Sequence, residues 1–240
     1  MRAIVRLMPK PGTSVFICGC GHTGSSLLAR ILATHPDIFS LPYETGAFAW
    51  ENGWPKWHRV VITLAKVAAS GRNIWVEKSP GHVNYTEEIR RTMPGARFII
   101  STRDGRDVVA SLNKRYDDPE KSFARWVRDT AASKSCIERG DSLVWRYEDF
   151  ISNPPDSLRS VCDFIGVTFR PEMLDYHEKP VIWGRQRSVR TEHSLRRWSQ
   201  VNQPITDYRG IWRTNLPQGM EERFATGEAR ELMTFFGYGH

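Results

Sequence analysis

The stretch FICGCGHTGSSLLARILATHP, residues 16–36, joins an apolar run, a glycine-rich turn and a helical pattern. The apolar run over 14–20 carries a glycine next to its end and predicts a short buried strand. Residues 25–35 carry apolar side chains at helical spacing, and Pro36 ends that pattern. A strand, a glycine-rich turn and a helix in this order are typical of a phosphate-binding loop.

The turn offers an anion several kinds of hydrogen-bond donor. Glycines let the backbone approach a phosphate and direct its N–H groups inward, and the helix that follows adds its partial positive charge. Ser25 stands where a nucleoside-triphosphatase loop carries its lysine, and no predicted strand clearly ends in a magnesium-binding aspartate. A ligand with a single 5′-phosphate therefore fits better than triphosphate hydrolysis, and the alternative is a turn that binds nothing. The predicted phosphate contacts are Gly21, His22, Thr23, Gly24, Ser25 and Ser26.

The rest of the chain alternates predicted strands and helices. Residues 46–60 hold three tryptophans and a proline and predict a loop or lid. The alternation predicts an α/β fold with three layers, in which helices flank a mainly parallel sheet, as in P-loop proteins. We expect one domain over 1–240, with an N-terminal extension at 1–13 and a basic loop region at 180–216. The predicted strands are 38–42, 73–79, 96–102 and 142–150, and the predicted helices are 60–70, 82–92, 103–116, 119–140, 154–167 and 219–236.

Composition narrows the class of ligand. The chain has 240 residues and a formal charge of +7, because it contains 34 lysines and arginines but only 27 aspartates and glutamates. This surplus suits nucleic acid, an acidic lipid surface or a phosphorylated cofactor. The basic residues are not interleaved with an RNA-recognition motif, so no nucleic-acid partner is expected. No apolar run is long enough for a membrane span, and four scattered cysteines without a signal-peptide pattern predict a cytoplasmic protein.

A second motif, STRDGRDVVAS at 101–111, begins at a predicted strand end and continues into a predicted helix. Arg103 lies at the start of the motif, and Ser111 follows about two helical turns later. A guanidinium binds oxyanions through two parallel hydrogen bonds, so this pair suits a second phosphate. The alternative is a solvated turn with local ion pairs. Two anion sites at separate strand ends fit a ligand that has two separate phosphate groups.

These motifs resemble those of sulfotransferases that use 3′-phosphoadenosine 5′-phosphosulfate (PAPS). GCGHTGSSLLARILATHPDI resembles their 5′-phosphosulfate loop, and FIISTRDGRDVVASL resembles their 3′-phosphate motif. The resemblance covers roughly 15–237 and is nearest to the tyrosylprotein and bacterial carbohydrate branch. It implies PAPS as donor, its product 3′-phosphoadenosine 5′-phosphate (PAP), no metal, and a hydroxyl acceptor on a glycan, a tyrosine-containing protein or a small molecule. Supporting stretches are VEKSP, VWRYEDF, SLRSVCDFIGV, RTEHSLRRWSQVNQPI and GIWRTNL.

The resemblance also implies roles for single residues. Glu44 matches the general base, and Lys78 matches a lysine that stabilises charge on the transferring group. His22 stands where family members usually carry lysine or arginine, and it can still donate a hydrogen bond. Tyr147 matches a position near the adenine, with core packing as the alternative. The residues that match the loop closing over the nucleotide are Arg187, Arg190 and Thr191.

Several alternatives remain open from the sequence. A P-loop small-molecule kinase is one, although Ser25 argues against it. A non-catalytic nucleotide-binding module is another, because of His22. Cys18 and Cys20 next to His22 suggest a metal site, but a zinc ion there would occupy the phosphate loop, so no metal is expected. The tryptophans expected either to line an acceptor cleft or to pack in the core are Trp50, Trp54 and Trp57.

Overall fold

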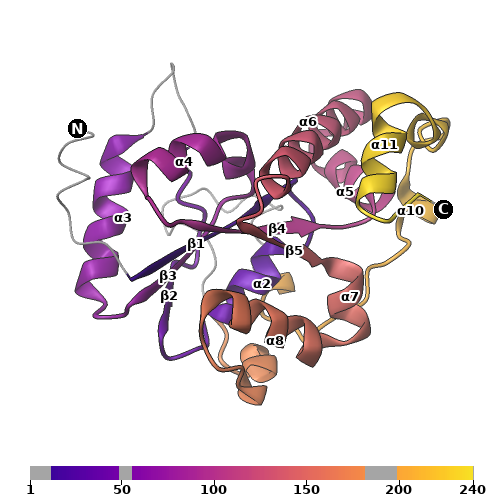
Figure 1. The fold of residues 1–240 in the computed structure, drawn as a ribbon. Helices are drawn as coiled ribbons and strands as arrows, with labels where there is room; N and C mark the ends of the chain where they lie inside the picture. The colour runs from indigo at the N-terminus through magenta and orange to yellow at the C-terminus, as the bar shows by residue number, and fades with distance from the viewer. Residues whose placement is uncertain (1–11, 49–55, 182–198, 240) are drawn as a thin grey trace.

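The computed structural model describes residues 12–48, 56–181 and 199–239. Within them, five strands form one sheet in the order β2-β3-β1-β4-β5, and every neighbouring pair is parallel. The sheet lies between two layers of helices, which confirms the predicted three-layer α/β fold (Figure 1). The strands are β1 (Thr13–Gly19), β2 (Ile38–Ser40), β3 (Ile74–Lys78), β4 (Arg97–Thr102) and β5 (Ser142–Arg146).

The helices cover both faces of this sheet. In Figure 1, α2 and α8 lie below it, α4 and α6 lie above it, and α3 lies to its left; α3 shares a core with α4. The described helices are α2 (Ser25–Leu32), α3 (Trp57–Ala69), α4 (Thr86–Thr92), α5 (Gly105–Tyr116), α6 (Pro119–Ile137), α7 (Tyr147–Ser152), α8 (Pro154–Ile165), α10 (Trp212–Asn215) and α11 (Gly227–Phe235). Three 3₁₀ helices, η1 (Pro80–Tyr85), η2 (Pro171–Glu178) and η3 (Glu222–Ala225), complete the set.

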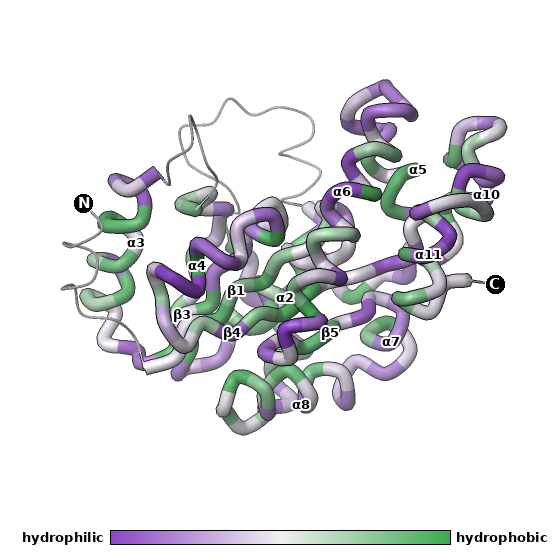
Figure 2. Tube along the Cα trace, turned by 45° about the horizontal axis from the view of Figure 1, so that its top comes forward, coloured by the Kyte–Doolittle hydropathy of each residue, from purple (hydrophilic) through white to green (hydrophobic). Residues whose placement is uncertain are grey.

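Strand β1 shows why the sheet needs both layers. Val15 and Ile17 point into the core shared with α2 and α8, whereas Phe16 and Cys18 point into the core shared with α3 and α4. All four side chains are fully buried. Side chains alternate between the faces of a strand, so a strand that is apolar at every position must be covered on both sides. Figure 2 shows this distribution: hydrophobic residues follow the central strands and α2, and hydrophilic residues gather on peripheral helices such as α4.

Several sequence predictions were wrong at their boundaries. The loop predicted over 46–60 ends earlier, because α3 begins at Trp57. The strand predicted over 142–150 ends at Arg146, because α7 begins at Tyr147. Two carboxylates in the first turn of α7 favour the positive end of a helix. The helix predicted over 219–236 is α-helical only over Gly227–Phe235, and the separate 3₁₀ helix η3 precedes it. No helix in the part of the chain that the structure describes is long and apolar enough to cross a membrane.

Candidate active site

The phosphate-binding loop joins β1 to α2 at the carboxyl edge of the sheet. Gly24 adopts a left-handed backbone, with φ at 87°, immediately before α2. A Cβ atom at this position would lie 2.9 Å from the ring of Tyr147, so both the backbone and the space require glycine. Thr23 Oγ1 donates to the carbonyl of Cys20 at 2.9 Å and also contacts the hydroxyl of Ser101 on β4. These contacts fix the loop against the strand that carries the second motif.

His22 connects this loop to helix α5. Its Nδ1 lies 2.8 Å from Oγ of Ser111. The backbone of His22 is also left-handed, with φ at 70°, which is uncommon for a residue other than glycine. The two motifs that the sequence assigned to separate phosphates are therefore in direct contact.

Lys78 brings together three segments of the chain. It is the last residue of β3, and its side chain is only 1% exposed. Its Nζ lies 2.8 Å from Oε1 of Glu44 and donates to Oγ of Ser26 at 2.9 Å. The side chain of Glu44 is 38% exposed, so it can meet a ligand from solution. The structure thus places the predicted base, the predicted lysine and a loop serine in contact.

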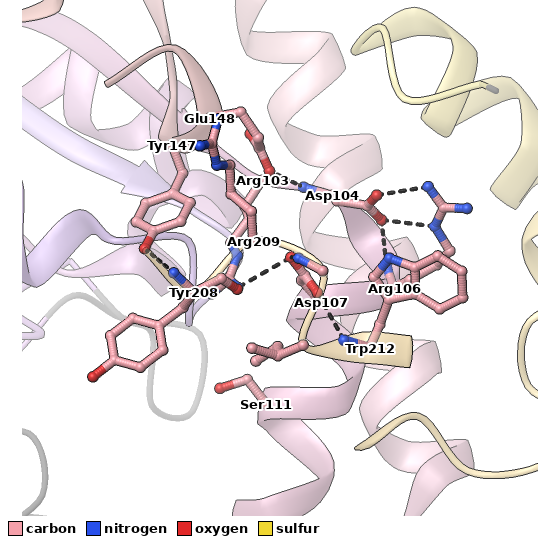
Figure 3. Close-up of polar contacts among 12 residues, drawn as sticks. Arg103, Asp104, Arg106, Asp107, Ser111, Tyr147, Glu148, Tyr208, Arg209 and Trp212 are labelled. Atoms are coloured by element: carbon pink, nitrogen blue, oxygen red, sulfur yellow. Dashed lines mark hydrogen bonds and ion pairs between the residues drawn. The ribbon is translucent and has the colours of Figure 1, made fainter. Parts of the chain in front are cut away.

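Arg103 directly follows β4, and it is buried among polar groups. Its guanidinium lies over the ring of Tyr147, 4.6 Å from the ring centroid. Its Nη2 donates to Oδ2 of Asp107 at 3.1 Å and to the carbonyl of Tyr208. Asp107 in turn accepts hydrogen bonds from the backbone of Gly210 and Trp212, both at 2.9 Å. Figure 3 shows the hydrogen bond from the backbone N–H of Trp212 to Asp107, and Ser111 one turn further along the same helix.

Tyr147 fixes the same C-terminal segment from the other side. Its hydroxyl donates to the carbonyl of Thr206 at 3.0 Å. It also accepts from the N–H of Tyr208 at 3.2 Å (Figure 3). Burial raises the pKa of this hydroxyl, so it remains a donor at neutral pH. Residues 206–212 are therefore attached to Arg103, Asp107 and Tyr147 at once.

Most of the side chains described above line one cavity of about 630 Å³. Its size is in the range of ordinary small-molecule and cofactor sites. From the predicted basic region at 180–216, Gln200, Gln203 and Tyr208 reach its wall. The predicted residues that line it are Gly21, His22, Gly24, Ser25, Ser26, Glu44, Arg103, Ser111 and Tyr147.

Other predicted residues lie elsewhere. Thr23 supports the loop from behind, and Lys78 reaches the site through Glu44 and Ser26. Trp57 begins α3 and packs in the core, so its role is structural. Trp50, Trp54, Arg187, Arg190 and Thr191 lie outside the described residues.

The sequence analysis missed three basic side chains and one acidic side chain of this region. Lys114, Arg115 and Arg125 line the cavity on α5 and α6. Lys114 and Arg115 lie three and four residues after Ser111, so helical spacing could have placed them on its face. Asp107 lies four residues after Arg103, and the same rule predicts their contact.

The described part of the chain contains no cluster of three or more histidine, cysteine or acidic side chains that could hold a metal ion. Cys18 and Cys20 are buried free thiols, and burial raises the pKa of both. A thiol with a raised pKa resists conversion to the thiolate that binds metals.

Comparison with known proteins was made for sequence and for fold. A family model described as "Sulfotransferase family" matches residues 49–171. A putative protein-tyrosine sulfotransferase of Caenorhabditis briggsae is 22% identical over 196 residues, which cover 68% of this chain and 69% of the relative. Protein-tyrosine sulfotransferase 2 of Gallus gallus is 23% identical over 231 residues, which cover 80% of this chain but only 60% of the relative.

Solved structures share the fold over nearly the whole chain. The sulfotransferase domain of the Synechococcus PCC 7002 olefin synthase has a TM-score of 0.63 at 18% identity, covering 96% of each chain. Mouse sulfotransferase SULT7A1, complexed with PAP, has a TM-score of 0.56 at 13% identity, covering 100% of this chain and 94% of the mouse chain.

Proposed function

Since this chain belongs to the sulfotransferase family, we propose that it transfers a sulfuryl group from PAPS to a hydroxyl acceptor. The observation that carries this proposal is the position of Lys78 Nζ between Glu44 Oε1 and Ser26 Oγ. It places a carboxylate that is open to solvent and a buried ammonium beside the phosphate-binding loop. Transfer of an anionic group needs both a proton acceptor and positive charge at this point.

The residues of the cavity fit a donor with two separate phosphate-bearing ends. The loop before α2 suits the 5′ end, because its backbone and the start of α2 favour an anion. Arg103 and Ser111 suit the 3′-phosphate. Among the described residues, Nε of Arg103 is buried without a hydrogen-bond partner, which leaves a donor for a ligand oxygen. Tyr147 lies between these ends and suits the nucleoside.

In the proposed reaction, Glu44 accepts the proton of the acceptor hydroxyl. As that oxygen forms its bond to sulfur, the bond between sulfur and the 5′-phosphate oxygen breaks, which yields a sulfate ester and PAP. Lys78 stabilises the negative charge of the transferring group, and His22 can donate a further hydrogen bond at the loop. No step requires a metal ion, because these side chains supply the proton acceptor and the positive charge.

The proposed acceptor is a carbohydrate hydroxyl or a tyrosine phenol. Both curated relatives compared above are named protein-tyrosine sulfotransferases, which supports the phenol. The same cavity is also lined by Lys114, Arg115 and Arg125.

The test is a pair of measurements on the purified chain. PAP should raise the melting temperature more than ATP with magnesium does. Radiolabelled PAPS should transfer its sulfur to a member of a panel of tyrosine peptides and glycans, in the presence of excess chelator. Stabilisation by ATP with magnesium alone would favour a small-molecule kinase. PAP binding without transfer to any acceptor would favour a non-catalytic binding module.

A further inference from the structure

The segment that follows Glu44 is held by side chains rather than by secondary structure. Each of the four backbone N–H groups from 45 to 48 donates to a side chain. Two of the acceptors lie at the end of β3 or directly after it, one lies in η1, and one is within the segment. The bonds run from Thr45 N to Glu77 Oε1 (3.3 Å), from Gly46 N to Ser79 Oγ (3.0 Å), from Ala47 N to Thr45 Oγ1 (3.1 Å) and from Phe48 N to His82 Nε2 (3.2 Å).

Glu77 is the centre of this network. Its Oε1 accepts from the hydroxyls of Thr45 and Ser79, both at 2.7 Å. Its Oε2 lies 2.8 Å from Nδ1 of His82, and both of these side chains are only 1% exposed. Burial by itself would raise the pKa of Glu77, but His82 and the two hydroxyls bring it below its ordinary value. Glu77 is therefore a buried carboxylate that these donors keep ionised.

The backbone of Phe48 determines which tautomer His82 adopts. Nε2 accepts the Phe48 N–H, so it carries no hydrogen of its own, and the ring hydrogen lies on Nδ1. Nδ1 lies 2.8 Å from Oε2 of Glu77, so His82 links the backbone at 48 to the carboxylate.

Two consecutive residues of β3, Glu77 and Lys78, contact two consecutive residues of the chain, Thr45 and Glu44. Glu77 and Lys78 are consecutive in the strand, so their side chains leave it on opposite sides. Lys78 contacts the carboxylate of Glu44, and Glu77 binds both the N–H and the hydroxyl of Thr45. Residues 44 and 45 are therefore each in contact with a side chain of β3.

We propose that Glu77, through Thr45 and His82, is a positioning residue that holds Glu44 at the reacting end of the cavity. This inference rests on the proposed role of Glu44 as general base. Glu77 itself is not among the residues that line the cavity. A general base must lie within hydrogen-bond reach of the proton it removes, and a displacement of about 1 Å can lower the rate up to about 10²-fold.

The first test needs neither PAPS nor a hydroxyl substrate. Glu77→Gln keeps the shape of the side chain but places an NH₂ group against the Nδ1–H of His82. Hydrogen exchange of the peptide that covers 45–48 should then be about tenfold faster or more, while exchange in β1 stays unchanged. Glu88→Gln is the matched control, because Glu88 is also a buried carboxylate but lies on α4. Unchanged exchange at 45–48 in Glu77→Gln would overturn the proposal.

The second test asks whether Glu77 acts through Glu44. In the wild-type background, Glu77→Gln should lower kcat about tenfold or more and leave PAP affinity within about twofold. In the Glu44→Gln background it should have no further effect on kcat, because no positioned base remains. An equal loss of kcat in both backgrounds would refute action through Glu44.

Two further comparisons distinguish failure of this proposal from misfolding of the variant and from failure of the proposed function. If Glu77→Gln does not fold, Thr45→Val removes the hydroxyl that binds Glu77 with little change in volume, and the same expectations apply to it. A wild-type chain that transfers no sulfuryl group would contradict the proposed function, whereas the exchange measurement would still decide whether Glu77 holds the segment.

Discussion

Nδ1 of His22 lies 2.8 Å from Oγ of Ser111, so the phosphate-binding loop and helix α5 meet through one side-chain contact. In the proposed function these residues serve opposite ends of the donor. Their contact means that the orientation of the Ser111 hydroxyl depends on the loop. Binding at the 3′ end is therefore expected to be coupled to the residue at 22.

A double-mutant cycle on PAP affinity tests this coupling. Ser111→Ala should weaken PAP binding by about 1 kcal/mol, because a hydrogen bond to phosphate is lost. In the His22→Asn background the same change should cost less than half as much, because the serine hydroxyl is no longer oriented there. Asparagine is the suitable replacement, since it tolerates the left-handed backbone of His22. Calorimetry of the four proteins gives the coupling energy.

Ser26→Ala is the matched control for this cycle, because Ser26 lines the same cavity but its hydroxyl accepts from Lys78. Its effect on PAP binding should be equal in the wild-type and His22→Asn backgrounds. Full additivity of Ser111→Ala with His22→Asn would contradict the proposed coupling.

Arg103→Ala should weaken PAP by about 2 kcal/mol or more, because a charge-assisted hydrogen bond to the 3′-phosphate is lost. Adenosine 5′-monophosphate has no 3′-phosphate, so its affinity should change much less. Arg106→Ala is the control: Arg106 lies in the first turn of α5, three residues after Arg103, but pairs with Asp104 and lies over the ring of Trp212. Titration calorimetry with both nucleotides measures the difference. Equal weakening of both nucleotides by Arg103→Ala would show that the arginine supports the site without binding the 3′-phosphate.

Asp107→Asn should destabilise the fold by about 2 kcal/mol, because its buried carboxylate accepts three hydrogen bonds and an amide cannot accept all of them. Asp104→Asn should cost less than about 1 kcal/mol, since asparagine caps a helix as well as aspartate does. Urea unfolding of both variants tests this contrast. Equal losses would mean that the bonds to Gly210 and Trp212 contribute little.

The sequence predicts the two phosphate-binding motifs of the site better than the long-range contacts that hold the surrounding segments in place. The loop before α2 and the pair Arg103 and Ser111 follow strands that pattern alone identifies, and parallel strands end at one edge of a sheet. Asp107 and Glu77 were missed as functional residues because the backbone segments that they hold are remote in sequence. Asp107 binds the backbone 103 and 105 residues later, and Glu77 binds Thr45, which lies 32 residues earlier.

The C-terminal part of the chain shows a second limit. Residues 199–212 have little helical or strand pattern, so the sequence indicated only a basic loop region there. The structure orders 206–212 through Tyr147, Arg103 and Asp107, which all lie in other elements. Likewise, no alternation of apolar residues marks the start of α7 at Tyr147, so the strand before it was predicted too long.

The pKa of Glu77 predicts how stability depends on pH. Its folded-state pKa lies below its ordinary value, so the unfolded chain binds the proton more tightly. Ionised Glu77 therefore contributes stability at neutral pH, and this contribution is lost as pH falls through the unfolded and then the folded pKa. Glu77→Gln cannot titrate. The difference in free energy of unfolding between wild type and Glu77→Gln should be largest above about pH 5 and should shrink as the pH falls below about 4.

Asp141 provides the comparison, because its hydrogen bond to Arg90 also lowers the pKa of its carboxyl. The Asp141 side chain is 41% exposed, so water and salt screen that pair, whereas Glu77 is buried. Urea unfolding across the acid range should show a smaller pH-dependent difference for Asp141→Asn than for Glu77→Gln. Added salt should reduce the Asp141 difference and leave the Glu77 difference nearly unchanged. A Glu77 difference that is constant across the acid range, or that salt removes, would mean that Glu77 is not held ionised by His82 and the hydroxyls of Thr45 and Ser79.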